Sequence, residues 1–477
     1  MTEDCKNLIL ETKSNSLLKN TLLYSIGNLA SKGLSFILVF FTTFYLSRED
    51  VGVFDLFLTT ISLLTPIVTL QLTDAVLRWL IENNQFENKA RVLTTSSFIL
   101  LVSIFIAIVG VLIFQNFYPF LFYKELLFLL GFQSFFLLFQ QFQRAIADNK
   151  GYVLSSVFYT FLYVFLAILF LVFYDKKIEG LLYSNIIAAF FSTVFIVFRN
   201  KVFGYIHGKY YSFQVAKELL FYSIPLVPNS LSWWAISSAN RYLIVLFLGV
   251  ASNGIFAIAF KFPTIVLLLV NVFYLAWQEK AIENYNREDK DDYYSAIFKK
   301  YVKYLFIISI NLLCINQLFL TYFVDITFYD SWRYTSVLLL AILFNALSGF
   351  YGTIYLGAKK TKSIFLSSLI SGIIVLLLSY FLIPVLELLG AAIAIFFGYF
   401  FLFLFRFFET KKYIKIVFPF ATFFVLFGVF MVLSVIMFLE LPYGIFWLPL
   451  VALVISCFLL QSELQIVYNK YLKKWMR

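Results

Sequence analysis

Four basic residues lie inside long apolar stretches of the chain: Lys32, Arg78, Arg241 and Lys261. A Lys or Arg at the centre of a membrane costs about 2.5–3.5 kcal/mol, so each residue needs a polar cavity or a partner. Both side chains bind phosphate by charge, and Arg also does so through two parallel hydrogen bonds. The four residues therefore predict a site for phosphate or pyrophosphate. Alternatively, each side chain extends to the membrane surface or pairs with Asp55 or Asp74.

Polar residues accompany these charges at helical spacing, which predicts the wall of a water-filled cavity. Ser and Thr alone also serve packing between membrane helices, so packing is the alternative role. Pro225 and Pro228 interrupt backbone hydrogen bonds in one of these stretches, which is typical of a helix that bends around a cavity. The residues predicted to line the cavity are Asn28, Ser35, Thr59, Ser62, Thr69, Ser237, Asn240 and Thr264.

Other chemistry has little support in the sequence. His207 is the single histidine and the three cysteines are far apart, which argues against a metal site, a histidine proton relay and a disulfide framework. The chain contains no P-loop motif. We therefore expect neither catalytic residues nor a cofactor, and no enzyme activity. Asp55 and Asp74 are the acidic residues that could couple transport to an ion.

The elements that position these residues are membrane helices. The chain has 477 residues, of which 62% are hydrophobic and only 13% charged, far from the composition of a soluble domain. Its apolar runs reach the ~20 residues that a membrane helix needs and lack the alternation of a membrane β-barrel. We predict fourteen helical spans: 20–46, 52–80, 91–115, 125–147, 151–174, 180–199, 219–248, 254–280, 301–323, 334–358, 363–384, 389–408, 414–438 and 442–461.

The distribution of basic residues predicts the orientation of these spans. With both termini inside, 29 of the 37 Lys and Arg residues fall in inside segments or helix ends and only 5 in outside loops. At ~1.5 Å per residue, Arg241 would then lie about 12 Å, Lys261 about 10 Å and Lys32 about 20 Å from the outer surface, with Arg78 near the inner end. The net charge of +11 indicates this bias and attraction to anionic lipid, and no nucleic-acid partner is expected.

A weak internal repeat predicts two lobes around a central cavity. Tyr24-Ser25-Ile26 and Gly52-Val53-Phe54 open the first two spans, while Tyr222-Ser223-Ile224 and Gly254-Ile255-Phe256 open the seventh and eighth. The expected organisation is a cytoplasmic tail (1–19), an N-lobe (20–200), an interfacial linker (201–218), a C-lobe (219–410), two extra helices (411–462) and a basic cytoplasmic tail (463–477).

At these positions the chain resembles the Wzx-type polysaccharide-export flippases of the MATE-like multidrug/oligosaccharidyl-lipid/polysaccharide exporter superfamily. The resemblance covers nearly the whole chain. In the first two spans it rests on Asn20-x7-Asn28-x3-Lys32-Gly33, on 47–54 (Ser-Arg-Glu-Asp-Val-Gly-Val-Phe) and on Arg78. In spans seven and eight it rests on Asn240-Arg241-Tyr242-Leu243-Ile244, on the following Leu248-Gly249 and on Gly254-Ile255-Phe256-x4-Phe260-Lys261. The family more often has Asp before the Arg of span seven. Asn240 stands there in this chain, which removes an ion pair and leaves Arg241 less neutralised.

The resemblance implies a flippase of the bacterial cytoplasmic membrane that moves an undecaprenyl-pyrophosphate-linked repeat unit by alternating access. The product would be lipopolysaccharide O-antigen, capsule or another surface polysaccharide of the cell envelope. The expected partners are the lipid-linked oligosaccharide, membrane lipids, and the polymerase and glycosyltransferases of the same pathway. The alternatives are a lipid II flippase, a cation-coupled multidrug antiporter, and a scaffold or polymerase of the same pathway, although a polymerase is expected to carry a larger outer loop.

Overall fold

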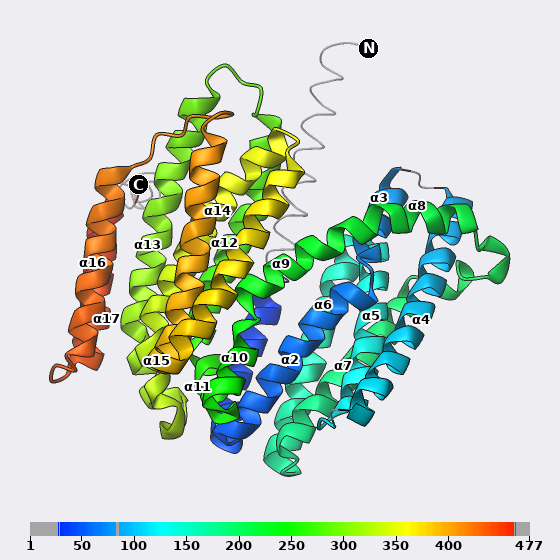
Figure 1. Cartoon of the computed structure of the whole chain (residues 1–477), viewed down its shortest axis with the longest axis horizontal. Coiled ribbons are helices and arrows are strands. Elements are labelled where there is room, and N and C mark those ends of the chain that lie inside the picture. The colour runs from blue at the N-terminus through cyan, green and yellow to red at the C-terminus, as the bar shows by residue number, and fades with distance from the viewer. Residues whose placement is uncertain (1–26, 28, 83–84, 118, 462, 464–477) are drawn as a thin grey trace, which may run out of the picture. The chain divides into compact units, whose positions relative to one another are not determined.

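The computed structural model describes residues 27, 29–82, 85–117, 119–461 and 463, and over these ranges the chain forms helices and no strand (Figure 1). Ten helical segments are long and apolar enough to cross a membrane. Every predicted span coincides with one or more of the described helices, so the all-α membrane fold is confirmed. Three further apolar helices are shorter: Leu29–Tyr45, Val250–Ala259 and Gly444–Leu459.

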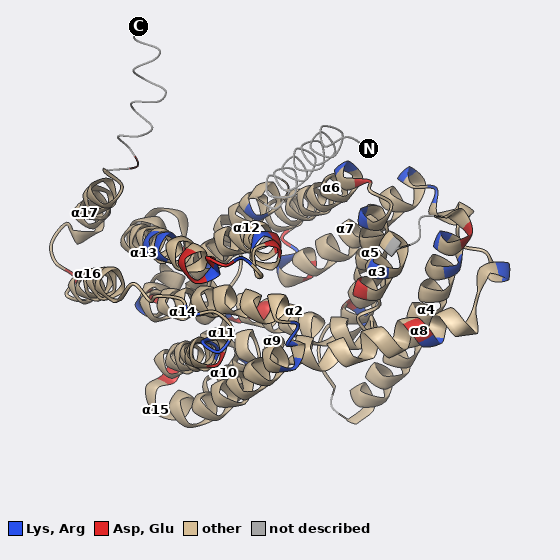
Figure 2. Ribbon diagram, turned by 90° about the horizontal axis from the view of Figure 1, so that it is seen from above, with Lys and Arg blue, Asp and Glu red and all other residues tan. Residues whose placement is uncertain are grey.

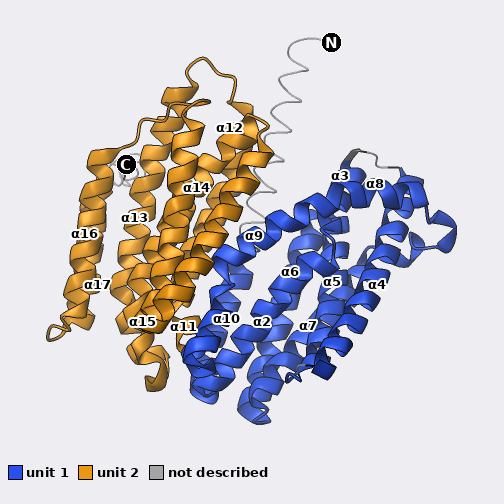
Figure 3. Cartoon of the chain, in the orientation of Figure 1, with its two compact units in different colours: residues 1–254 blue, residues 255–477 orange. Residues whose placement is uncertain are grey.

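The chain divides into two compact units, residues 1–254 and 255–477 (Figure 3). The first unit includes the predicted interfacial segment 201–218. Its helices are α2 (Arg48–Val68), α3 (Leu72–Glu82), α4 (Phe86–Phe117), α5 (Tyr123–Ala145), α6 (Asn149–Ile168) with the π-turn η1 (Leu169–Phe173), α7 (Lys177–Arg199), α8 (Phe213–Ser223), α9 (Val227–Ser237), α10 (Asn240–Leu248) and the first half of α11 (Val250–Ala259).

Two predicted spans of the first unit are interrupted helices. The predicted span 52–80 is α2 followed by α3, with Leu70 and Gln71 in left-handed backbone conformations at φ 49° and 54°. The predicted span 219–248 is α8, a short 3-10 turn (η4, Ile224–Leu226), α9 and α10. Pro225 accounts for the first of these breaks, because proline cannot donate a helical hydrogen bond. Interrupted helices are where transporters place binding sites.

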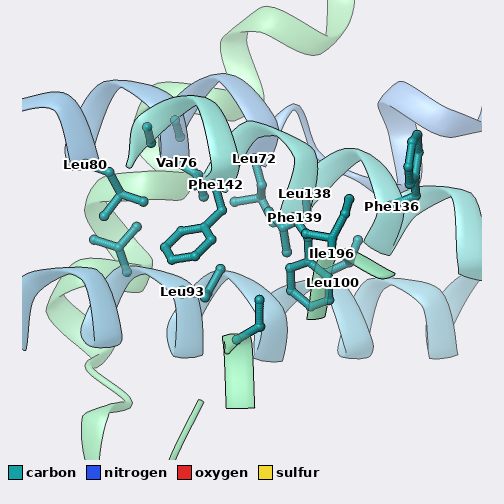
Figure 4. Packing of buried hydrophobic residues seen from close by; sticks show 14 of the residues in the cluster. Leu72, Val76, Leu80, Leu93, Leu100, Phe136, Leu138, Phe139, Phe142 and Ile196 are labelled. Atoms are coloured by element: carbon teal, nitrogen blue, oxygen red, sulfur yellow. The ribbon is translucent and has the colours of Figure 1, made fainter. Parts of the chain in front are cut away.

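A hydrophobic core holds α3, α4, α5, α7 and α8 together (Figure 4). Phe142 of α5 and Leu93 of α4 are fully buried there, and Leu219 joins them from α8. A second core joins α2 to α5 and α7 through Phe57, Leu129 and similar residues. These cores fix α2 and α3 against the rest of the unit, so the polar face of α2 has a defined position.

The second unit contains the rest of the chain after Gly254. Its central helix is α14, in which 83% of the most apolar stretch is buried. The helices are the second half of α11, α12 (Lys261–Glu283), α13 (Lys290–Phe323), the 3-10 segment η5 (Ile326–Ser331), α14 (Trp332–Gly357), α15 (Thr361–Thr410), α16 (Phe420–Phe438) and α17 (Gly444–Leu459).

Helix α15 contains the two predicted spans 363–384 and 389–408, joined at Glu387, whose backbone is not helical (φ 51°, ψ −133°). Its second half is fixed to α14 by Arg406, which is only 2% exposed. The guanidinium donates to the carbonyl of Ser348 at 3.1 Å and to the hydroxyls of Ser367 and Ser368 at 3.2 Å each. A buried cation is thus satisfied by neutral acceptors.

Charged residues are sparse along the helices, and most of the ribbon is neutral (Figure 2). The large exposed side chains are instead apolar, such as Phe105 and Ile106 on α4 and Phe424 and Val425 on α16. In water such surfaces would be unfavourable, whereas in lipid they are the expected outer surface of a helix. The chain is a multi-pass membrane protein.

Candidate functional site

The interrupted span α9–α10 follows the polar face of α2 within the first unit. The indole Nε1 of Trp234 donates to the carbonyl oxygen of Thr59 at 3.1 Å. The hydroxyls of Thr60 and Tyr242 lie 2.7 Å apart. These hydrogen bonds fix the two spans in register along the length that carries Arg241.

Arg241 lies at the centre of a charged cluster formed by Asp55, Ser237, Arg241 and Asn253, which we name the Arg241 cluster. The Arg241 Nε donates to Asp55 Oδ2 at 3.0 Å, and Nη1 donates to the carbonyl oxygen of Ser237 at 2.8 Å. Asn253 Nδ2 lies 3.3 Å from the same Asp55 oxygen. Arg241 is 8% exposed, so its charge needs this neutralisation.

The backbone passes from one helix to the next beside Arg241. Helix α9 ends at Ser237 and α10 begins at Asn240, so Arg241 lies in the first turn of a new helix. The N–H groups of Arg241 and Tyr242 donate to the carbonyl oxygens of Ser238 and Ala239 at 3.2 Å each, so these groups do not contact the carboxylate. The guanidinium of Arg241 supplies the positive charge, and Asp55 is the anion that it binds in this structure.

The cluster is closed on one side by a tight crossing of α2 and α11. A side chain at Gly52 would place a Cβ 2.0 Å from the carbonyl oxygen of Val250, and one at Gly254 would lie 2.1 Å from that of Arg48. Asn253 Nδ2 also donates to the carbonyl oxygen of Gly52 at 2.9 Å. Gly52 and Gly254 are the paired glycines of the predicted repeat, and the structure brings them into contact.

Asn240 is fully buried beside Arg241 in the sequence. Neither its Oδ1 nor its Nδ2 has a hydrogen-bond partner among the described residues. A buried amide without partners costs about 1–3 kcal/mol, so such a group requires an explanation. The ion pair that an Asp at this position would form is supplied here by Asp55. Of the two partners considered for Arg241 in the sequence, Asp55 of span two is the one that provides the carboxylate.

The other predicted cations belong to other helices. Arg78 of α3 stacks on the ring of Tyr222, with 4.7 Å from its Cζ to the ring centroid, and lies 5.8 Å from that of Trp79. Lys32 is exposed on the helix Leu29–Tyr45. Lys261 is exposed at the start of α12 and belongs to the second unit. Asp74 lies exposed on α3, one turn before Arg78.

A second polar feature of the first unit is a pocket of about 350 Å³ at the break between α2 and α3. We name it the Thr69 pocket. It brings together Ser62 and Thr69, which the sequence predicts to line a cavity. Its nine lining residues come from α2, the following turn, α3, α5 and α9: Ser62, Thr65, Pro66, Thr69, Gln71, Thr73, Gln133, Leu137 and Ser230.

The remaining predicted lining residues make local contacts. The hydroxyl of Ser35 donates to Ser31 O at 3.0 Å, and that of Thr264 to Phe260 O at 2.8 Å in the second unit. Thr59 is buried and contributes its carbonyl to Trp234. Asn28 lies outside the described residues. The described part of the chain holds no group of three or more His, Cys, Asp or Glu residues that could bind a metal ion.

Two residues of these sites, Asn253 and Gln133, and one buried cation of the second unit, Arg406, were not predicted from the sequence. Asn253 is the one amide of α11, and Gln133 is one of four glutamines of α5, so nothing in their spacing distinguishes them from packing residues. Arg406 lies one turn from the end of its span, where a basic residue usually reaches solvent. Only the packing of α14 against α15 shows that it is buried.

Comparison with known structures identifies the fold. One match is a multidrug resistance MATE family transporter of the MOP superfamily, in an inward-facing conformation, at 15% identity and a TM-score of 0.66, covering 81% of this chain and 98% of that one. The lipid II flippase MurJ, in an inward closed conformation, matches at 15% identity and a TM-score of 0.64, covering 94% and 100%. A MOP superfamily transporter from Pyrococcus furiosus matches at 14% identity and a TM-score of 0.58, covering 83% and 96%.

The family is identified from sequence. Among curated proteins, none matches this chain. A family model described as "Polysaccharide biosynthesis protein" matches residues 17–277, more than half of the 477 residues. That range contains the Arg241 cluster, the Thr69 pocket and the four predicted cations. The chain therefore belongs to the polysaccharide biosynthesis protein family, and it has the fold of the MOP superfamily transporters.

Proposed function

We propose that this protein is a flippase that moves an undecaprenyl-pyrophosphate-linked oligosaccharide repeat unit outward across the bacterial cytoplasmic membrane. The exported unit would serve the synthesis of O-antigen, capsule or a similar surface polysaccharide. Membership of the polysaccharide biosynthesis family and a transporter fold support this class of substrate. The division of the chain into two compact units supports the two lobes that alternating access requires.

The observation that carries the proposal is the position of Arg241. It lies nearly buried in the first turn of α10, and its guanidinium favours an anion. Asp55 Oδ2, 3.0 Å from Nε, takes the position that a phosphate oxygen would take. A pyrophosphate group offers more charge than one carboxylate and can accept two parallel hydrogen bonds from Arg.

The proposed cycle exchanges one anion for another. The pyrophosphate displaces Asp55 from Arg241 when the substrate binds, and Asp55 returns when the substrate leaves. Because a buried cation without a partner is costly, this exchange never leaves Arg241 uncompensated. Lys32, Arg78 and Lys261 are proposed to contact the pyrophosphate at other stages of the cycle, and Asp55 or Asp74 to carry a coupling ion.

The membrane potential favours this direction of transport. Moving one charge across 100 mV is worth about 2.3 kcal/mol, so two negative charges moving outward across an inside-negative membrane gain about 4.6 kcal/mol. A cationic drug would gain nothing from this field. It would also meet the nearly buried Arg241, which disfavours the multidrug antiporter as the function of this chain.

The test is the deletion of the gene in its own host, followed by analysis of the lipid-linked precursors. We expect a pyrophosphate-linked repeat unit to accumulate inside and surface polysaccharide to disappear. Complementation with wild-type protein should restore export, and Arg241→Ala, expressed at equal level in the membrane, should not. Accumulation of lipid II with normal surface polysaccharide would instead assign the lipid II flippase activity. Normal export by Arg241→Ala would overturn the role of the Arg241 cluster.

A further inference from the structure

The Thr69 pocket has a chemistry different from that of the Arg241 cluster. None of its nine lining residues is charged, and five of them carry a hydroxyl group. A phosphate site would be expected to contain Lys or Arg. A site for a hard cation or a cationic drug would be expected to contain a carboxylate. A neutral ligand that both donates and accepts hydrogen bonds fits this lining.

The hydroxyls of the pocket are already oriented by the helix backbone. Ser62 donates to Thr59 O at 2.7 Å, Thr65 to Ile61 O at 2.7 Å, and Thr69 to Thr65 O at 2.8 Å. A hydroxyl that donates its proton to one hydrogen bond can still accept others through its lone pairs. The pocket therefore presents a row of fixed acceptors along one face of α2.

Two side-chain amides add donors to this row. Gln71 Nε2 donates to the hydroxyl of Ser230 on α9, which leaves its second N–H and its carbonyl oxygen for another group. The amide of Gln133 makes no hydrogen bond to any described residue, and neither of its polar atoms is enclosed. Pro66 and Leu137 supply apolar surface beside these amides. This combination of donors, acceptors and apolar surface suits a sugar ring.

The backbone at the pocket is strained. Leu70 and Gln71 are consecutive non-glycine residues in the left-handed region, a conformation that costs about 1–2 kcal/mol for each residue. Nothing in a continuous membrane helix requires such a turn. Strain of this kind is found at ligand sites, where the surrounding structure enforces it. Here the turn carries Gln71 toward Ser230 and opens a space of about 350 Å³, which is within the range of ligand pockets.

The pocket is also well placed relative to the Arg241 cluster. Asp55 and Thr65 are ten residues apart on the continuous helix α2, which corresponds to about 15 Å along its axis. A pyrophosphate alone cannot reach both places. A molecule with a charged end and a neutral extended part can.

From these observations we propose that the Thr69 pocket is a glycan subsite, which binds a neutral sugar of the lipid-linked substrate through hydroxyls and the amides of Gln71 and Gln133. This proposal rests on the proposed flippase function and assigns the recognition of the sugar to residues that the pyrophosphate does not touch. Removing one amide should therefore weaken the binding of sugar-bearing lipids and leave that of the bare lipid unchanged.

The experiment compares defined lipids on the purified full-length protein in lipid nanodiscs. The probes are undecaprenyl pyrophosphate and four derivatives that carry one glucose, galactose, N-acetylglucosamine or N-acetylgalactosamine. The wild-type protein should bind at least one sugar-bearing lipid more tightly than the bare lipid. Gln133→Leu and Gln71→Leu should each reduce this preference roughly 3- to 10-fold, the effect of losing one hydrogen bond. Gln214→Leu is the matched control, because Gln214 is an exposed amide on α8 outside the pocket.

The outcomes separate the subsite from the flippase function. If the bare lipid binds but no sugar-bearing lipid binds more tightly, or if both pocket variants keep the wild-type preference, the glycan subsite is wrong and the pyrophosphate site stands. An equal loss for bare and sugar-bearing lipids in the pocket variants also overturns the subsite. Failure of the bare lipid to bind the wild-type protein, or unchanged binding by Arg241→Ala, overturns the proposed function itself.

Discussion

The Nε atom of Arg241 lies 3.0 Å from Oδ2 of Asp55, and Nδ2 of Asn253 approaches the same oxygen at 3.3 Å. One carboxylate oxygen of α2 thus accepts hydrogen bonds from a cation of α10 and from an amide of α11. In this structure the charge of Arg241 is balanced by Asp55, and it becomes available to another anion only when Asp55 moves away. This relationship yields the first prediction.

Asp55→Asn should leave Arg241 without its carboxylate and so destabilise the empty protein. We expect a loss of about 1–3 kcal/mol, because Arg241 is buried and Asp55 partly exposed. Inorganic pyrophosphate should restore the melting temperature in this variant more than it raises that of wild type, since a ligand stabilises the state that it binds. Thermal unfolding of the protein in detergent, with and without pyrophosphate, measures both effects.

The control for this prediction is the double variant Asp55→Asn with Arg241→Gln, in which neither charge is present. It should be more stable than Asp55→Asn alone and should not respond to pyrophosphate. An equal response of the single and double variants would show that pyrophosphate acts at some other place.

Substitution of Gly52 tests the crossing of α2 and α11. Gly52→Ala places a Cβ 2.0 Å from the backbone oxygen of Val250, which cannot move without shifting α11. We expect a loss of about 1–3 kcal/mol or more and a lower melting temperature. Gly110→Ala on α4 is the control, since no atom lies within 4 Å of its new Cβ. That control should gain up to about 1 kcal/mol from helix propensity. Equal stability of the two variants would contradict the tight crossing.

A pH dependence is expected at the ends of α5, α6 and α7. Arg199 donates to Asp148 at 2.9 and 3.1 Å, and Asn200 and the Gly151 N–H also donate to it. Chiefly because of Arg199, the pKa of Asp148 is lowered from 3.8 to about 2. A lowered folded-state pKa stabilises the protein above pH 3.8, and this contribution is lost as the pH falls toward 2.

The measurement is the melting temperature of wild type and Asp148→Asn between pH 6 and pH 2.5. Wild type should be more stable by about 1 kcal/mol at pH 6, a modest value because both side chains are partly exposed. The difference should shrink below about pH 4. Asn can keep the capping hydrogen bond from Gly151 through Oδ1, but its Nδ2 cannot accept from Arg199 and Asn200, so the variant removes the charge together with these hydrogen bonds. A difference that stays constant over this range would refute the linkage.

The orientation of the spans can be tested by cysteine labelling. In a variant without Cys5, Cys314 and Cys457, an impermeant thiol reagent added outside should label Asp175→Cys, between α6 and α7. It should not label Lys209→Cys, between α7 and α8. Both positions are exposed. Labelling of Lys209→Cys in intact cells would reverse the topology that the basic residues predict.

The helices could be predicted from sequence because membrane helices are defined by apolar length. The interruption at Leu70 and Gln71 could not, since neither residue prefers a left-handed backbone and the turn depends on packing around the pocket. The break at Pro225 could be predicted, because proline itself lacks the backbone N–H that a helical hydrogen bond needs. The break at Glu387 was also predicted, since it falls between the predicted spans 363–384 and 389–408, three residues after Pro384.

The candidate sites were predicted unevenly for a similar reason. Arg241 stands out because a charge in an apolar run is rare, and Asp55 was one of two partners weighed for it. That Asp55 and not Asp74 is the partner depends on which face of α2 meets α10, a property of the packed unit. Asn253 and Gln133 are polar but uncharged, so their cost in a membrane is too small to mark them in a sequence.

The ion pair between Asp55 and Arg241 also sets an order for the biogenesis of this protein. The two residues are 186 positions apart, so at about 5–20 residues per second Asp55 leaves the ribosome roughly 10–40 s before Arg241. When span seven reaches the translocon, inserting the charge of Arg241 into the membrane costs about 2.5–3.5 kcal/mol. The carboxylate that neutralises this charge, Asp55, is already present in span two. Insertion of helix α10 therefore costs least when α10 packs beside α2, which was inserted long before it. The early spans act as a template for the late one.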